Sequence, residues 1–228
     1  MERISCRAIL FDLDGVLVDS TPAVERVWTL WALENGFDPE ETVRRAHGRP
    51  SVETLRELLP GANHAAEDLK VEGRELVELD GIVPLPGVLD LLSALHPDQW
   101  TVVTSCTRPL AEARIRVAGL AFPARMVTSS DISRGKPDPE PYLKGAEVLA
   151  VEAPECLVVE DAPAGVRAGK AAGARVLGLT TALPAADLVE AGADWVAEDC
   201  AALRLADGAA KGGRIELVLR PSIVSRAR

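Results

Sequence analysis

The sequence predicts an α/β protein in which helices cover a mostly parallel sheet and an all-helical module follows the first strand. Short apolar segments alternate with longer stretches rich in Ala, Leu, Arg and Glu, as expected of repeated βα units. Most of the apolar segments are continuous rather than alternating, which is typical of strands buried on both faces. The chain has 228 residues, 47% of them hydrophobic, which is enough for one large core and an insertion.

Six continuous apolar segments are expected to form the sheet. They are residues 7–12 (RAILFD), 100–105 (WTVVTS), 125–130 (RMVTSS), 156–161 (CLVVED), 175–180 (RVLGLT) and 194–198 (DWVAE). A further run, RIELVLR at 214–220, is expected to add an edge strand. Helical patterns fill the intervals at 87–96, 108–119, 139–151, 163–173 and 184–191. Since each crossover holds a helix, neighbouring strands should run parallel.

Residues 19–81 interrupt this alternation because they carry helical patterns only. The segment ends at DGIVPLPGV, where two prolines and two glycines exclude a continuous helix. We therefore expect a core built from residues 1–18 and 82–228, with residues 19–81 as a small helical domain above the end of the first strand. Trp28 and Trp31 are expected to pack in the interior of that helical domain.

Charge and composition disfavour several kinds of partner. The net charge of −10 disfavours binding to nucleic acid, and no apolar run is long enough to span a bilayer. The first residues, MERISCRAILFD, lead straight into a strand and leave no room for a cleavable signal. The four cysteines are widely spaced, as expected of free thiols in a reducing compartment. We expect a cytoplasmic monomer without nucleic-acid or membrane partners.

Polar residues collect where the predicted strands end, which is where ligands bind in a parallel sheet. Taken singly, these residues have ordinary explanations as an acidic turn, a helix N-cap, a surface cation and an acidic helix start. Their occurrence at several strand ends predicts a site. They are Asp12, Asp14 and Gly15 after the first strand, Thr104 and Ser105 after the second, Lys136 beyond the third, and Glu160 and Asp161 after the fourth.

The chemistry that these residues indicate is phosphoryl transfer. Clustered carboxylates at the end of a buried strand need a cation, and Asp12 and Asp161 with a backbone carbonyl and waters suit Mg²⁺. The metal would offset repulsion while one aspartate attacks phosphorus to form an aspartyl phosphate. Asp14 could protonate the leaving oxygen and later deprotonate water. Thr104 and Lys136 could hold the phosphate oxygens.

In their order along the chain, these motifs resemble those of the haloacid dehalogenase superfamily of phosphatases. The resemblance covers about residues 8–200, and GKPDPEPY and VVEDAPAGVRAGKAAGA are similar to the branch with a helical cap. That branch includes sugar- and polyol-phosphate phosphatases and β-phosphoglucomutase. The resemblance implies a Rossmann-like sheet with the first strand central and a small helical cap domain inserted after it.

The resemblance also implies a role for each motif residue. Asp12 would be the nucleophile and a metal ligand, and Asp14 would be the acid/base that gives its backbone carbonyl to the metal. Asp161 would bind Mg²⁺, with Glu160 as a direct or water-mediated ligand. The residues that bind phosphate would be Thr104, Ser105 and Lys136.

Differences between this sequence and related families disfavour three other activities. Dehalogenases lack the second aspartate, which is present here as Asp14. Lys70 lies in a sequence typical of a solvated helix face, which disfavours the Schiff-base lysine of a phosphonatase. Val24 stands where β-phosphoglucomutase has a cap histidine, which argues against a mutase. We expect a Mg²⁺-dependent phosphatase of a small phosphorylated metabolite, a sugar or polyol phosphate; the alternatives are a phosphomutase and a non-enzymatic metal- and phosphate-binding module.

His47 and Arg49, in RAHGRPS, are the candidate substrate contacts of the cap. The Gly-x-Pro context suggests a loop between two helices, and a loop there could point toward the core. Arg49 could bind a second anion or a sugar hydroxyl. The alternative is a surface arginine beside a capping histidine, and the sequence leaves both open.

Overall fold

The structure is a computed structural model that describes residues 2–46, 50–206 and 213–220. Its centre is a six-stranded parallel sheet in the order β6-β5-β2-β7-β8-β9. The strands are β6 (Met126–Val127), β5 (Trp100–Val103), β2 (Ala8–Phe11), β7 (Cys156–Glu160), β8 (Arg175–Leu179) and β9 (Trp195–Ala197). The predicted α/β fold is confirmed, with the first predicted strand, β2, in the interior of the sheet.

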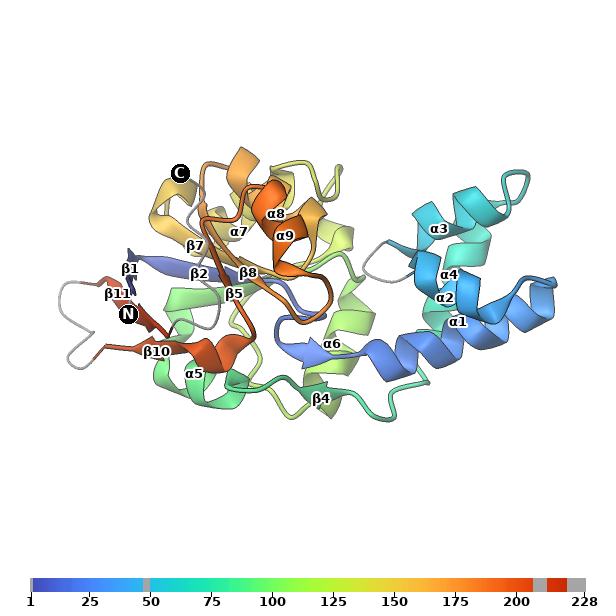
Figure 1. Ribbon diagram of the computed structural model, residues 1–228, viewed down its shortest axis with the longest axis horizontal. Coiled ribbons are helices and arrows are strands. Elements are labelled where there is room, and N and C mark those ends of the chain that lie inside the picture. The colour runs from blue at the N-terminus through green and yellow to red at the C-terminus, as the bar shows by residue number, and fades with distance from the viewer. Residues whose placement is uncertain (1, 47–49, 207–212, 221–228) are drawn as a thin grey trace.

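Helices cover both faces of this sheet (Figure 1). One face carries α5 (Val88–Ala94) and α6 (Arg108–Val117), and the other carries α7 (Glu140–Val148), α8 (Pro163–Ala171) and α9 (Ala185–Glu190). The side chains of β2 alternate between the two resulting cores, with Ile9 and Phe11 in one and Ala8 and Leu10 in the other. Because both faces are buried, the strand is a continuous apolar run in the sequence.

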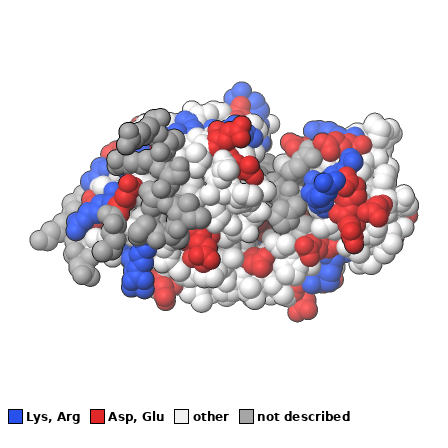
Figure 2. All heavy atoms as spheres, viewed as in Figure 1, with Lys and Arg blue, Asp and Glu red and all other residues white. Residues whose placement is uncertain are grey.

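Among the described residues, four helices lie between β2 and α5 and form a separate body at the right of Figure 1. They are α1 (Thr21–Asn35), α2 (Pro39–Ala46), α3 (Ser51–Leu58) and α4 (His64–Glu75). Their own core contains Trp28 and Trp31, whose ring centroids are 5.4 Å apart in an edge-on contact, so the expectation for these two residues is confirmed. Figure 2 shows acidic and basic side chains mixed over this body, where Arg45 pairs with Glu41 at 2.7 Å.

The chain enters and leaves the helical body through two short strands that pair with each other. β3 (Val18–Asp19) and β4 (Val83–Pro84) are antiparallel. We propose the limits 1–18, 19–81 and 82–228 for the core and the helical domain, since this pairing lies at both junctions. Within the described residues, no helix combines the length and the apolar character needed to cross a membrane.

A second sheet corrects the prediction of an extra edge strand. The segment expected at 214–220 forms β11 (Ile215–Leu219), which lies between β1 (Glu2–Cys6) and β10 (Leu203–Leu205) in a three-stranded antiparallel sheet. It is therefore the middle strand of another sheet. β1 and β10 were not predicted, because β1 buries only alternate residues, Ile4 and Cys6, and β10 has three residues of which only Leu203 is buried.

A short 3₁₀ turn ends one of the predicted strands early. The strand predicted over 125–130 ends at Val127, because the Asp131 carboxylate accepts hydrogen bonds from the Thr128 N–H and hydroxyl and starts a turn. The 3₁₀ turns are η1 (Pro97–Gln99), η2 (Ser129–Asp131), η3 (Ala153–Glu155) and η4 (Cys200–Ala202).

Candidate active site

The carboxyl ends of β5, β2 and β7 are adjacent in the sheet, and they bring three of the predicted motifs together. Asp12 directly follows β2, and its N–H donates to the Val159 carbonyl of β7 at 3.0 Å. Thr104 directly follows β5, and Glu160 is the last residue of β7. The site therefore forms because parallel neighbouring strands end at the same edge.

Lys136 reaches this edge from the segment between η2 and α7. Its Nζ lies 2.7 Å from Asp12 Oδ1 and 2.6 Å from Glu160 Oε1, and it donates to the Val103 carbonyl at 3.1 Å. The side chain is only 9% exposed. The lysine thus links all three strand ends, and it is a buried cation rather than a solvated one.

Glu160 is held by four donors. Its Oε1 accepts from Lys136 and from the Tyr142 hydroxyl at 2.7 Å, and its Oε2 accepts from the N–H groups of Asp161 and Ala162 at 3.1 and 3.2 Å. Its residue exposure is 1%. Because both oxygens already have partners, Glu160 is fixed in one orientation.

Asp12, Glu160 and Asp161 form an acidic cluster in which one carboxylate oxygen from each residue lies within 4.8 Å of the other two. Burial raises the pKa of Asp12 to about 7 despite the attraction of Lys136. Burial, reinforced by the charges of Glu160 and Asp12, also raises the pKa of Asp161 well above its usual range. One lysine therefore does not balance the three acids, and a further cation would stabilise their charged forms.

The backbone at position 15 packs closely against the Asp161 carboxylate. Gly15 has a φ of +76°, and a Cβ at this position would lie 2.0 Å from Asp161 Oδ2. Position 15 therefore requires glycine both for its left-handed backbone and for space. Hard oxygen donors in a buried acidic cluster fit a divalent cation such as Mg²⁺.

The Asp14 carboxylate has three partners that the sequence analysis missed. The Ser20 hydroxyl donates to Oδ1 at 2.6 Å, and the Cys106 thiol donates to Oδ2 at 3.1 Å. Arg114 forms an ion pair with Oδ2 at 2.7 Å. The sequence held one signal that Arg114 is buried, because Arg114 lies on the same helix face as the apolar, buried Leu110.

Thr104 and Ser105 differ in their surroundings. Thr104 is buried, and its Oγ1 accepts a hydrogen bond from the Cys106 N–H at 3.1 Å. Since the Cys106 thiol contacts the Asp14 carboxylate, Thr104 lies close to Asp14. Ser105 is exposed on the same loop. Their role in binding phosphate stays a prediction. His47 and Arg49 lie outside the described residues, and Val24 packs against the core of the helical body.

Known proteins share both the sequence and the fold. The family model of haloacid dehalogenase-like hydrolases matches residues 6–173. The chain belongs to this family. Hexitol phosphatase A of Escherichia coli is 48% identical over 177 residues, which cover 75% of this chain and 82% of that protein. Glycerol-1-phosphate phosphohydrolase 1 of Saccharomyces cerevisiae is 32% identical, covering 94% and 91% of the two chains.

A solved structure agrees with this assignment. The crystal structure of a hydrolase from Pseudomonas syringae superimposes with a TM-score of 0.75 at 29% identity, covering 85% of this chain and 94% of that one. The resemblance found in the sequence is confirmed. With its named phosphatase relatives, the family identifies this haloacid dehalogenase-like hydrolase as a phosphoric monoester hydrolase.

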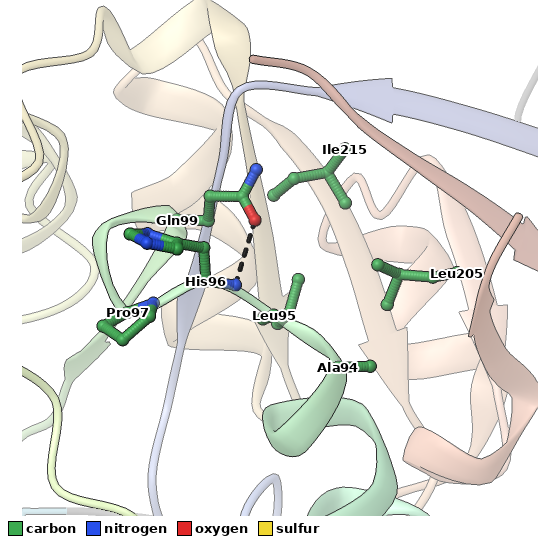
Figure 3. A pocket seen from close by; sticks show the side chains of 7 residues that line it. All are labelled: Ala94, Leu95, His96, Pro97, Gln99, Leu205 and Ile215. Carbon is green, nitrogen blue, oxygen red and sulfur yellow. Dashed lines mark hydrogen bonds between the residues drawn. The ribbon is translucent and has the colours of Figure 1, made fainter. Parts of the chain in front are cut away.

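A pocket lies elsewhere in the hydrolase, between the α5–η1 corner and the second sheet (Figure 3). It has a volume of about 330 Å³, and Leu95, Leu205 and Ile215 contribute to its apolar lining. Gln99 accepts a hydrogen bond from the His96 N–H at its rim. Because His96 and Gln99 precede β5, this pocket is at the amino end of that strand, opposite the acidic cluster.

Gly165→Ala is expected to destabilise the hydrolase by about 1–3 kcal/mol. Gly165 lies on α8, and a Cβ there would be 1.7 Å from Glu160 Oε1, so the alanine would force Glu160 away from its four donors. Thermal unfolding measures the change. Gly73→Ala is the control, since Gly73 is an exposed residue of α4 with open space around it and the alanine should stabilise slightly. Equal unfolding temperatures for Gly165→Ala and the wild type would show that Glu160 is not tightly fixed.

Proposed function

We propose that this hydrolase removes the phosphoryl group from a small polyol or sugar phosphate, with Mg²⁺ bound, through an aspartyl phosphate on Asp12. The observation that carries the proposal is the contact of Lys136 with Asp12 and Glu160 at the carboxyl end of the sheet, next to Asp161. This arrangement places the proposed carboxylate nucleophile, a buried cation and further acidic side chains next to one another. A module that only bound phosphate would not need a second carboxylate at Asp14.

Asp12 and Asp161 are the ligands that we expect to hold Mg²⁺, together with the Asp14 carbonyl. When bound, the ion would offset the repulsion between the anionic nucleophile and an anionic phosphate. Both oxygens of Glu160 accept hydrogen bonds from the protein, which favours contact with the ion through water. Its fixed carboxylate would then orient the ion's water ligands.

In the first half-reaction, an Asp12 carboxylate oxygen attacks phosphorus, and the bond from phosphorus to the ester oxygen breaks. Asp14 in its protonated form gives its proton to the departing alkoxide, so the product leaves as a neutral alcohol. Lys136 and the loop with Thr104 and Ser105 would bind the non-bridging oxygens. Lys136 already contacts Asp12, so it can hold phosphate and nucleophile together.

In the second half-reaction, the Asp14 carboxylate takes a proton from water, and the water oxygen attacks phosphorus. The bond from phosphorus to Asp12 breaks, which frees inorganic phosphate and restores the Asp12 carboxylate. Asp14 ends this step protonated, as it began the first one. The two aspartates therefore carry one complete turnover with no change in net protonation.

The two named relatives support a polyol phosphate as the substrate, since their names specify a hexitol and a glycerol phosphate. We expect hexitol and glycerol phosphates to give the highest kcat/KM in a panel that also holds hexose, nucleotide and two-carbon phosphates. Release of inorganic phosphate is the readout. A preference for nucleotides or two-carbon acids would contradict this substrate class. An isomerised phosphate product that depends on a bisphosphate activator would instead establish the mutase alternative.

We further propose that the enzyme works in the cytoplasm. All four cysteines are free, and three of them are buried. Free thiols persist in reducing compartments, whereas exported proteins tend to pair theirs.

A further inference from the structure

Arg114 is a buried cation that the mechanism above does not use. It lies on α6, and its side chain is only 5% exposed. Nη1 is 2.7 Å from Asp14 Oδ2, and Nη2 is 3.5 Å from Glu75 Oε1 on α4. Burying a guanidinium costs desolvation free energy. We therefore asked what Arg114 contributes by its contacts with the two carboxylates.

The two carboxylates that Arg114 joins belong to different parts of the fold. Asp14 follows the central strand β2 in the core, whereas Glu75 is the last residue of α4 in the helical body. A second contact joins the N-terminal end of α6 to α4, because the hydroxyl of Thr107, the N-cap residue of α6, donates to Glu72 Oε1. The Thr107 hydroxyl contacts the helical body, whereas Arg114 contacts both Glu75 of that body and Asp14 of the core.

The contacts of Asp14 show what Arg114 contributes to it. The Ser20 hydroxyl holds Oδ1, while Oδ2 has Arg114 and the Cys106 thiol. Arg114 Nη1 also donates to Cys106 Sγ at 3.1 Å, so it holds the thiol that in turn contacts Asp14. A thiol is a weak donor. Without Arg114, Oδ2 would keep only that weak partner, and the carboxyl group could rotate.

We propose that Arg114 is a positioning residue: its guanidinium, anchored on Glu75 of α4, fixes the orientation of the Asp14 carboxyl group. This inference rests on the acid/base role of Asp14 in the proposed function. If Arg114 has this role, the orientation in which Asp14 transfers a proton depends on the contact between the helical body and the core. Among the described residues, Arg114 has ion-pair or hydrogen-bond contacts with Asp14, Glu75 and Cys106, and none with the proposed nucleophile Asp12.

Loss of Arg114 is therefore expected to slow the steps in which Asp14 moves a proton. A displacement of about 1 Å in a catalytic group costs roughly 100-fold in rate. We expect Arg114→Met to lower kcat for a polyol phosphate by about 10- to 100-fold with little change in KM. Arg114→Lys should recover part of this loss, because lysine keeps the charge but lacks the planar fork that reaches both carboxylates.

A substrate with a good leaving group distinguishes positioning from general damage. With p-nitrophenyl phosphate, nitrophenolate leaves without a proton donor, so Asp12 is phosphorylated at a near-normal rate. Hydrolysis of the aspartyl phosphate still needs Asp14 as a base. Stopped-flow measurements on Arg114→Met should therefore show a burst of one nitrophenolate per enzyme followed by slow turnover. Glu75→Gln, which removes the anchor alone, should give a smaller burst.

Thr107→Val is the matched control, because it removes the other contact between α6 and α4 and leaves Arg114 and Asp14 in place. It should show no burst. The inference is overturned if Arg114→Met and Glu75→Gln keep wild-type kinetics, or if both slow the burst phase and the later turnover equally. If Arg114→Met does not fold, Arg114→Lys and Glu75→Gln decide the question. An inactive wild-type enzyme would instead contradict the proposed function.

Discussion

Asp12→Asn is expected to abolish phosphatase activity, by about 10⁴-fold or more, and to leave the fold intact. The amide lacks the anionic oxygen that attacks phosphorus, and it removes one expected ligand of the metal. The amide has nearly the shape of the carboxylate, and Lys136 keeps Glu160 and the Val103 carbonyl as partners, so we expect the fold to persist. Circular dichroism and thermal unfolding in EDTA establish the fold, and phosphate release measures activity.

Asp187→Asn is the control for this substitution, since Asp187 is an exposed residue in the first turn of α9. It should retain full activity. Residual turnover by Asp12→Asn above a few per cent would show that another group attacks phosphorus or that water attacks directly.

Lys136→Met is expected to abolish activity and to lower the free energy of unfolding in EDTA by about 3–5 kcal/mol. Its loss leaves Asp12 and Glu160 buried without the cation that they share. Added Mg²⁺ should restore part of the stability, since it can neutralise the same cluster, but not the activity, since the phosphate-binding cation is gone. Urea unfolding with and without Mg²⁺ measures both changes.

Lys170→Met provides the comparison, because Lys170 pairs with Asp194 at 2.8 Å in a setting where both side chains are about one-third exposed. Such a pair contributes about 1 kcal/mol or less. If Lys136→Met were no less stable than Lys170→Met in EDTA, the lysine would not be compensating the buried acids.

The sequence predicted those parts of the protein in which one short pattern determines one element. Strands buried on both faces, such as β2 and β7, are continuous apolar runs that precede polar residues. Since parallel strands end at the same edge, residues that follow the predicted strands were expected to lie close together, and Asp12 and Glu160 both contact Lys136. The second sheet escaped prediction because β1 and β10 are only partly buried and so lack a continuous apolar run, and because β1 pairs with β11, which is distant in the sequence.

The surroundings of Asp14 escaped prediction for a different reason. Arg114 and Glu75 carry no motif, and each alone is typical of a charged helix surface. Their burial depends on how α6 packs against α4, which no local pattern encodes. Periodicity shows that Arg114 shares a helix face with Leu110 and Ala111, but it does not show that two carboxylates lie next to that face.

The most direct test of this account is phosphate release from a hexitol phosphate by the wild-type enzyme with Mg²⁺, after EDTA treatment, and after Mg²⁺ is restored. We expect release with Mg²⁺, loss of at least most of the activity in EDTA, and full recovery when the metal returns. Release that EDTA does not affect would contradict the role of the acidic cluster as a metal site. No release by the folded, Mg²⁺-loaded protein from this or any other phosphate monoester would contradict the phosphatase itself.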